Sequence, residues 1–220
     1  MIIFSGLPHR PMHNQRSVPD ADTIASLPEF PRLTLDRITL VNTPEQAREA
    51  CAALREHPSL GFDTESKPTF LKEQVSDGPH IVQLATRHHA WVFQLHDHGC
   101  RDQVSHLMGE AGRSLAGFGL GDDIRRIKHK LGVAPQGIVE LNTWFRERGY
   151  RKEVGVKGAV AVLFAQRFIK SKKAATSNWS ARQLSDGQLV YAANDAYAAA
   201  WVHQALLDQP ATLSAGASRA

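Results

Sequence analysis

Two carboxylates, Asp63 and Glu65, lie two positions apart in an otherwise apolar stretch of this chain. Residues 60–65 read Leu-Gly-Phe-Asp-Thr-Glu, which predicts a strand, and side chains two positions apart in a strand share one face. Two like charges held together in apolar surroundings repel each other, and this repulsion raises the pKa of one carboxyl group. A hard divalent cation bound between them would remove the repulsion. The pair therefore predicts a metal-dependent enzyme.

The composition indicates one globular domain in a reducing compartment. Of the 220 residues, 42% are hydrophobic and 22% are charged, which is ordinary for an α/β domain with appendages. No run of apolar residues is long enough to span a membrane, and the first residues lack the features of a secretory signal. Cys51 and Cys100 are not spaced as in a zinc site or a disulfide framework, which favours the cytoplasm. No oligomeric state follows from these features.

Positive charge is concentrated in one part of the chain. The whole sequence has a formal net charge of +4, whereas residues 143–183 contain ten basic residues against two acidic ones, a local balance of 10 − 2 = +8. A solvated surface could carry the same excess. Next to an acidic metal site, however, the excess favours a phosphodiester substrate, because such a substrate needs both a metal and positive charge.

The chain divides into an arm, a domain and a tail. Residues 1–33 contain five prolines and no strong helix signal, so we expect an extended N-terminal arm. Residues 210–220 are small and polar, which predicts a flexible tail. Residues 34–209 alternate between strand and helix patterns and form the predicted domain.

The domain pattern predicts an α/β fold with a mixed β-sheet flanked by helices. Strands are expected at residues 38–41, 60–65, 81–85, 91–95, 114–118 and 138–141. The segment between the third and fourth strands is too short for a helix, so these two form an antiparallel hairpin, while the later strands belong to parallel βα units. Thr43 and Ser185 begin capping boxes, and Asp122 or its neighbour is expected to cap a helix that ends at Gly132. Further helices are expected at about residues 101–110, 143–149, 157–169 and 185–208.

Three more residues extend the acidic pair. Asp123 follows the glycine-rich turn of residues 117–121 and falls in the first turn of a helix, where an acid is often only a favourable helix charge. Tyr191 and Asp195 are four residues apart, which places them on one helix face, one turn apart. A buried tyrosine with a local hydrogen bond is the simpler alternative for this last pair.

Taken in chain order, these motifs resemble the tyrosine subgroup of the DEDD 3′–5′ exonucleases, and most of all the ribonuclease D and Werner-type exonuclease domains. Residues 62–65 match the first motif, residues 117–123 the second and residues 178–196 the third. The resemblance covers about residues 35–208. The adjacent Asp122 and Asp123 leave two registers for the second motif, and the spacing from the glycines favours Asp123.

The resemblance implies a ribonuclease H-like fold and two divalent cations, Mg²⁺ or Mn²⁺. Asp63 would bridge the two ions, Glu65 and Asp195 would serve the ion that activates water, and Asp123 would serve the other. Tyr191 would orient the attacking water, because a phenol with an ordinary pKa of about 10 is a poor base at neutral pH.

The same resemblance implies removal of nucleoside monophosphates from a 3′ end, with DNA as the first expectation. RNA trimming of the ribonuclease D type and a catalytically silent nucleic-acid-binding module are the alternatives. The second motif lacks an asparagine before its aspartate, which favours the Werner-type branch. A second helical module like that of ribonuclease D does not follow residue 208, so binding of structured RNA is less supported.

Basic and aromatic residues near the motifs are candidate nucleic-acid contacts. Lys170, Lys172 and Lys173 flank the third motif and are expected to contact phosphates. Phe70 and Trp179 could stack on a base, although Trp179 also fits the core. A second basic group follows Asp123, where a solvent-exposed helix face is the alternative; its members are Arg125, Arg126, Lys128 and Lys130.

Two other kinds of site fit the sequence less well. The glycines of residues 117–121 suggest a dinucleotide-binding turn, but Asp122 occupies the position where the third glycine of that motif should fall. The histidines of residues 88–89 and 96–98 suggest a zinc site, but no further ligand spacing supports one.

Overall fold

Six strands form one mixed sheet in the order β1-β4-β3-β2-β5-β6. The structure, a computed structural model, describes residues 16–68 and 77–209. Strands β2, β3 and β4 pair antiparallel, whereas the pairs β1–β4, β2–β5 and β5–β6 are parallel, which confirms the predicted hairpin and βα units. The strands are β1 (Ile38–Val41), β2 (Ser59–Glu65), β3 (Ile81–Ala85), β4 (Ala90–Gln94), β5 (Ser114–Gly117) and β6 (Ile138–Glu140).

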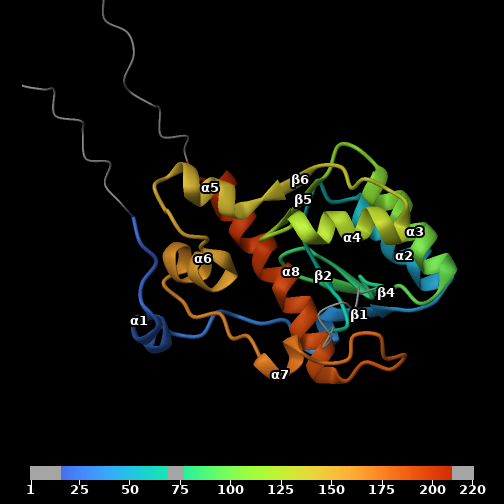
Figure 1. The fold of residues 1–220 in the computed structure, drawn as a ribbon, viewed down its shortest axis with the longest axis horizontal. Coiled ribbons are helices and arrows are strands. Elements are labelled where there is room, and N and C mark those ends of the chain that lie inside the picture. The colour runs from blue at the N-terminus through green and yellow to red at the C-terminus, as the bar shows by residue number, and fades with distance from the viewer. Residues whose placement is uncertain (1–15, 69–76, 210–220) are drawn as a thin grey trace, which may run out of the picture.

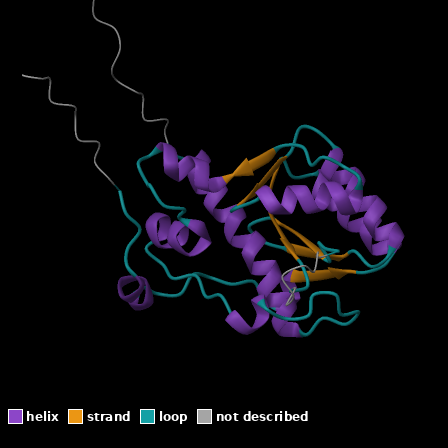
Figure 2. Ribbon diagram, in the orientation of Figure 1, coloured by secondary structure: helices purple, strands orange, loops and turns teal. Residues whose placement is uncertain are grey.

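Helices cover both faces of the sheet (Figures 1 and 2) and enclose one core on each side. One face is covered by α2 (Pro44–Arg55), α3 (His98–Gly109) and α4 (Gly121–Leu131). The other face is covered by α5 (Leu141–Glu147), α6 (Gly155–Phe164) and α8 (Asp186–Leu207). In the described part of the chain, no helix is both long and apolar enough to cross a membrane.

Helix α8 is the main element of its layer and crosses the sheet diagonally (Figure 1). It begins at the predicted capping box, in which the Ser185 hydroxyl accepts from the N–H of Gln188 at 3.3 Å and the Gln188 side chain accepts from the N–H of Ser185 at 3.0 Å. Six of its buried positions are alanines. Small side chains let a helix axis approach a sheet closely, and this approach positions the site described below.

The N-terminal arm is less extended than the prolines suggest. Helix α1 (Ala21–Ser26) forms within it, because the Asp20 carboxylate accepts from the N–H of Thr23 at 2.8 Å and so caps the helix. A 3₁₀ turn, η1 (Leu35–Arg37), then leads into β1. Residues 1–15 and the predicted tail, residues 210–220, lie outside the described residues.

The start of α4 also differs from the expectation. Leu120, and not Asp122, is the N-cap residue, and its side chain makes no capping bond. The Glu140 carboxylate accepts from the N–H of Gly119 at 3.1 Å and from that of Leu120 at 2.8 Å, so a residue distant in sequence satisfies these donors. The helix ends at Gly132, in the left-handed conformation, as predicted. Another short helix, α7 (Lys172–Ala175), was not expected.

Candidate active site

Strand β2 and helix α8 bring three carboxylates together. Asp63 and Glu65 lie on β2 and Asp195 lies on α8, and one carboxylate oxygen from each falls within 4.8 Å of the others. Asp63 and Glu65 are partly buried, whereas Asp195 is only 5% exposed. The two-residue spacing on β2 therefore places both side chains toward one helix, as the sequence predicts.

Gly61 allows α8 to approach β2 closely enough for this cluster. A Cβ atom at position 61 would lie 1.8 Å from the carbonyl oxygen of Ala196 and 2.6 Å from the backbone nitrogen of Ala200. Both are backbone atoms of α8, so they cannot rotate away. Because Gly61 shares its strand face with Asp63, the same close approach places Asp195 beside that carboxylate.

Asp123 reaches the site from the first turn of α4. The Thr64 hydroxyl donates to its carboxylate. The neighbouring Asp122 is exposed and pairs with Arg125 at 3.0 Å, so Asp123, and not Asp122, is the acid bonded to β2. Asp123 lies outside the group of three carboxylates, but its charge contributes to the raised pKa of Asp63.

The electrostatics of the cluster call for a cation. Burial raises the pKa of Asp63, and the charges of Asp195 and Asp123 raise it further. Burial, together with the charge of Asp63, raises the pKa of Glu65 to about 9. Asp195 Oδ1 is buried without a hydrogen-bond partner among the described residues. An oxygen-rich group with an orphaned carboxylate oxygen fits Mg²⁺ or Mn²⁺.

Lys170 supplies positive charge to this metal-free arrangement. Its ammonium nitrogen lies 2.7 Å from Asp195 Oδ2 and 5.2 Å from the centre of the Tyr191 ring. Burial disfavours the charged ammonium, but the pairing with Asp195 and the nearby charge of Asp63 outweigh it, so the pKa of Lys170 is raised. The sequence predicted Lys170 as a phosphate contact and contained no signal for this ion pair.

Tyr191 lies one helical turn before Asp195 and is 8% exposed. Burial raises the pKa of its hydroxyl, and the Asp195 charge adds to the effect. The phenol therefore keeps its proton at neutral pH and can donate a hydrogen bond. Trp179 packs against Tyr191 with 5.9 Å between ring centres and is only 1% exposed. The buried ring fits the core alternative for Trp179, and stacking on a base stays a prediction.

Two cavities open at the carboxylates, and Asp195 lines both. One, of about 440 Å³, is also lined by Asp63, Phe118, Lys157 and Lys170. The other, of about 420 Å³, lies beside Tyr191. Phe118 and Lys157 were missed by the sequence analysis, although Phe118 falls within the predicted second motif.

Comparison with known proteins identifies the family. Residues 38–210 match the family model described as 3′–5′ exonuclease. The chain belongs to this 3′–5′ exonuclease family. The match covers most of the chain and includes β2, α4 and α8, the three elements that carry the acidic residues.

Two curated relatives of this chain are named as 3′–5′ exonucleases. The exonuclease chain is 26% identical over 157 residues to a 3′–5′ exonuclease of Arabidopsis thaliana, covering 70% of this chain and 54% of the relative. It is also 26% identical over 149 residues to the bifunctional 3′–5′ exonuclease/ATP-dependent helicase WRN of Mus musculus, covering 67% of this chain and 11% of the relative. The chain thus spans about half or less of the length of these curated relatives.

A solved structure supports the fold. The RNase D of Trypanosoma brucei in complex with RNA U12 superposes with a TM-score of 0.69 at 20% identity, and the match covers 86% of this chain and 65% of that chain. This likeness confirms the predicted ribonuclease H-like architecture of the exonuclease domain.

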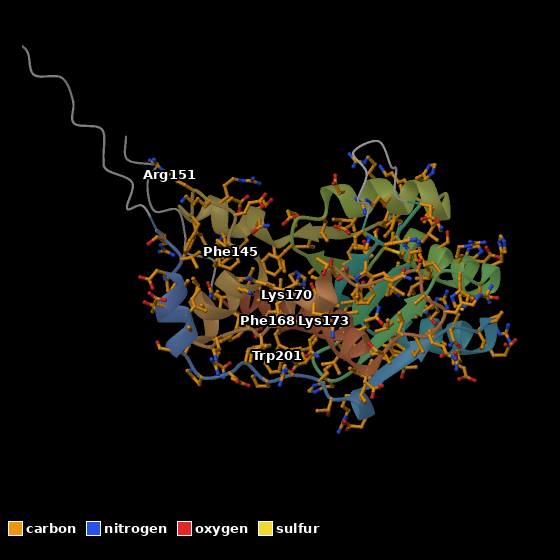
Figure 3. The ribbon with its side chains drawn as sticks, turned by 60° about the horizontal axis from the view of Figure 1, so that its bottom comes forward. Phe145, Arg151, Phe168, Lys170, Lys173 and Trp201 are labelled. Atoms are coloured by element: carbon orange, nitrogen blue, oxygen red, sulfur yellow. The ribbon has the colours of Figure 1, made fainter. Side chains whose placement is uncertain are left out.

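The residues predicted to contact nucleic acid differ in how close they lie to the exonuclease centre. Lys172 and Lys173 are both exposed, and Lys173 lines the cavity beside Tyr191. Figure 3 shows Lys170 and Lys173 near the middle of one face, with Arg151 toward its edge. Phe70 lies outside the described residues.

Two of the four basic residues that follow Asp123 have partners within the protein, and they fit the alternative of a solvent-exposed face of α4. Arg125 pairs with Asp122 at 3.0 Å, with both side chains exposed. Lys130 donates to the carbonyl oxygen of Asp77 at 2.8 Å. Neither side chain lines the two cavities at the exonuclease centre.

The described residues do not support a dinucleotide-binding turn or a histidine zinc site. The Glu140 carboxylate occupies the N–H groups of the glycine-rich turn that a dinucleotide phosphate would need. His89 Nε2 lies 2.8 Å from the Thr39 hydroxyl, and His98 contacts Arg101. Across residues 16–68 and 77–209, the only group of three or more potential metal ligands is that of the three carboxylates.

Proposed function

We propose that residues 34–209 form a metal-dependent 3′–5′ exonuclease that hydrolyses phosphodiester bonds of nucleic acid and releases nucleoside monophosphates. The observation that carries this proposal is the cluster of Asp63, Glu65 and Asp195 within 4.8 Å, in which Asp195 Oδ1 lacks a partner among the described residues. Three carboxylates at this separation, one buried and two partly buried, repel each other without a cation. A phosphodiester substrate, itself anionic, is a further reason for a cation to bind there.

The proposed roles follow from the positions of the side chains. Asp63, Glu65 and Asp195 would hold two divalent cations together with Asp123, which Thr64 orients through its hydroxyl. When bound, such cations lower the pKa of a coordinated water and stabilise negative charge on the leaving 3′ oxygen.

Tyr191 would position the attacking water. Its hydroxyl lies on the same helix as Asp195 and keeps its proton, so it donates a hydrogen bond and does not act as a base. Lys170 is close enough to the carboxylates to exchange its contact with Asp195 for one with a phosphate oxygen when the cluster is filled.

DNA is the first substrate in this proposal and RNA the second. The resemblance to the Werner-type branch supports DNA. The similar RNase D of Trypanosoma brucei is seen in a complex with RNA U12, which supports RNA as the second candidate. The free thiols of Cys51 and Cys100 are both buried, which supports the further proposal of a cytoplasmic location.

One assay tests both the reaction and the polymer. Oligonucleotides of DNA and RNA, labelled at the 5′ end and supplied as single strands and duplexes, are incubated with Mg²⁺, Mn²⁺ or a chelator. A ladder that shortens from the 3′ end only with metal is the expected result. Activity that persists in chelator, or products that shorten from the 5′ end, would reject the proposal.

A further inference from the structure

The cavity beside Tyr191 is partly built by the N-terminal arm. It has a volume of about 420 Å³ and shares Tyr191 and Asp195 with the exonuclease centre. Ile169, which is 38% exposed, contributes an apolar side chain to its wall. Arg32 and Lys173 contribute two cations. Arg32 comes from the arm and is far in sequence from every motif of the family.

Arg32 belongs to a segment that is firmly attached to the domain. We call residues 28–33 the N-terminal strap; Figure 1 shows it in blue between α1 and β1. The N–H of Phe30 donates to the carbonyl oxygen of Arg167 at 2.9 Å, and the Arg167 guanidinium pairs with Glu29 at 2.8 Å. The Phe30 ring is 4% exposed. It lies 5.4–6.5 Å, centre to centre, from the rings of Phe164, Phe168, Tyr197 and Trp201.

The end of the strap is held by the residue next to a candidate metal ligand. The Asn194 side chain accepts from the N–H of Leu33 at 2.8 Å and donates to the carbonyl oxygen of Leu33 at 3.1 Å. Asn194 is 3% exposed and directly precedes Asp195. Because both bonds are buried, the backbone beside Arg32 cannot move away from α8 without leaving polar groups unpaired. We call this pair of bonds the Asn194 latch.

The two cations at the cavity are free to bind a ligand. Neither Arg32 nor Lys173 makes a side-chain hydrogen bond or an ion pair with any residue in the described part of the chain, and both are exposed. Arg48 on α2, by contrast, pairs with Glu45 at 3.1 Å. A cavity with an apolar wall and two unpaired cations matches a nucleotide, which has a flat base and an anionic phosphate. A guanidinium is especially suited to two phosphate oxygens at once.

We propose that the N-terminal strap forms one wall of the substrate site and that Arg32 binds a backbone phosphate of the strand whose 3′ end is being cleaved. The base of the same nucleotide lies against the apolar wall near Ile169. The Asn194 latch holds Arg32 in position, so Asn194 is a positioning residue. This inference rests on the proposed exonuclease function, and it adds a substrate contact from outside the family motifs.

The test compares Arg32→Ala, Arg32→Lys and Arg48→Ala in hydrolysis of a 5′-labelled single-stranded oligonucleotide with Mn²⁺. Arg48→Ala is the matched control, because it removes an exposed arginine from the opposite face of the sheet. We expect Arg32→Ala to raise KM about tenfold with kcat unchanged. Its KM should also respond less to salt, with the logarithmic slope reduced by about 0.7, the value for one phosphate contact on a single strand. Arg32→Lys should retain part of the affinity.

Each result has a separate meaning. If the wild-type protein releases no nucleotides from a 3′ end with any metal, the proposed function fails. If the wild type is active and Arg32→Ala keeps the wild-type KM and salt slope, only the inference about the strap fails. A lower kcat at unchanged KM would also overturn the inference, because it would mean that Arg32 does not act through substrate binding.

The Asn194 latch is tested with a second variant. Asn194→Ala should raise KM in the same direction as Arg32→Ala, and the double variant should add little to either single change, because both act on one contact. Thermal unfolding of each variant shows whether the fold is kept. Full additivity of the two changes in KM would show that the latch and Arg32 act independently, which contradicts the inference.

Discussion

The ammonium of Lys170 lies 2.7 Å from the carboxylate of Asp195, inside the group of acids that would hold the metal. In the metal-free protein this side chain partly neutralises Asp195, which is only 5% exposed. The flexible lysine side chain can leave Asp195 when a divalent cation binds there. The planar, more rigid guanidinium of an arginine would compete with the cation more strongly for the same carboxylate. Lys170 thus stabilises the folded protein while no metal is bound.

Lys170→Met should therefore destabilise the metal-free protein more than the metal-bound protein. Loss of the ion pair leaves Asp195 without its partner, and we expect a decrease of about 1–3 kcal/mol in the free energy of unfolding. Saturating Mn²⁺ should recover much of this loss, because the metal replaces the missing charge. Urea unfolding with chelator and with Mn²⁺ measures both values. Lys172→Met, an exposed neighbour, is the control, and an equal gain from Mn²⁺ in Lys170→Met and wild type would contradict the prediction.

Asp63→Asn should abolish metal-dependent hydrolysis while keeping the fold. The change removes a central ligand, and we expect a loss on the order of 10²-fold or more in rate. It also removes repulsion from Asp195 and Asp123, so the melting temperature in chelator should be equal to that of the wild type or higher. Asp122→Asn is the matched control, because Asp122 is exposed, pairs with Arg125 and lies outside the group of three carboxylates. Wild-type turnover in Asp63→Asn would refute the metal site.

Gly61→Ala should separate α8 from β2. The added Cβ would meet the backbone of Ala196 at 1.8 Å, so the helix must shift, which costs about 1–3 kcal/mol of stability. The same shift moves Asp195 away from Asp63, so affinity for Mn²⁺, measured by calorimetry, should fall as well. Gly121→Ala adds a Cβ with no atom within 4 Å and should leave both quantities near the wild-type values.

His203 should make the protein sensitive to mild acid. Burial lowers the pKa of this side chain, which is 6% exposed, with Nδ1 2.7 Å from the Ser59 hydroxyl. In the unfolded chain a histidine takes up a proton as pH falls below about 6.5. The folded protein takes it up only at lower pH, so stability decreases as pH falls through this window.

The comparison of His203→Gln with His88→Gln tests this effect. Unfolding free energies are measured in chelator at neutral pH and at mildly acid pH. The loss between the two should be smaller in His203→Gln than in the wild type, by at most about 1.4 kcal/mol per pH unit. His88 is exposed, so its replacement should leave the loss unchanged. An identical pH response in all three proteins would show that His203 is not responsible.

Local signals in the sequence predicted the parts of the site that lie within one element. The alternation of a strand places Asp63 and Glu65 on one face, and the helical turn places Tyr191 above Asp195. The capping box at Ser185 predicted the start of α8 within one residue. These features depend on neighbouring residues alone.

Contacts between distant elements could not be predicted in the same way. The Asn194 latch joins α8 to the arm, and the Glu140 carboxylate replaces an expected cap at Asp122. The order of the strands in the sheet and the ion pair of Lys170 with Asp195 also depend on how distant elements pack. Residue spacing contains no information on such contacts, because they depend on how complete elements pack.

The close contact between Gly61 and α8 has a consequence for biosynthesis. Strand β2, with its acidic pair, leaves the ribosome well before α8, which ends at Leu207. Until that helix is made and docks against Gly61, the third carboxylate is missing and the proposed metal centre is incomplete. We therefore expect a nascent chain that has not yet added α8 to lack the proposed activity, because one of its three clustered carboxylates has still to be made.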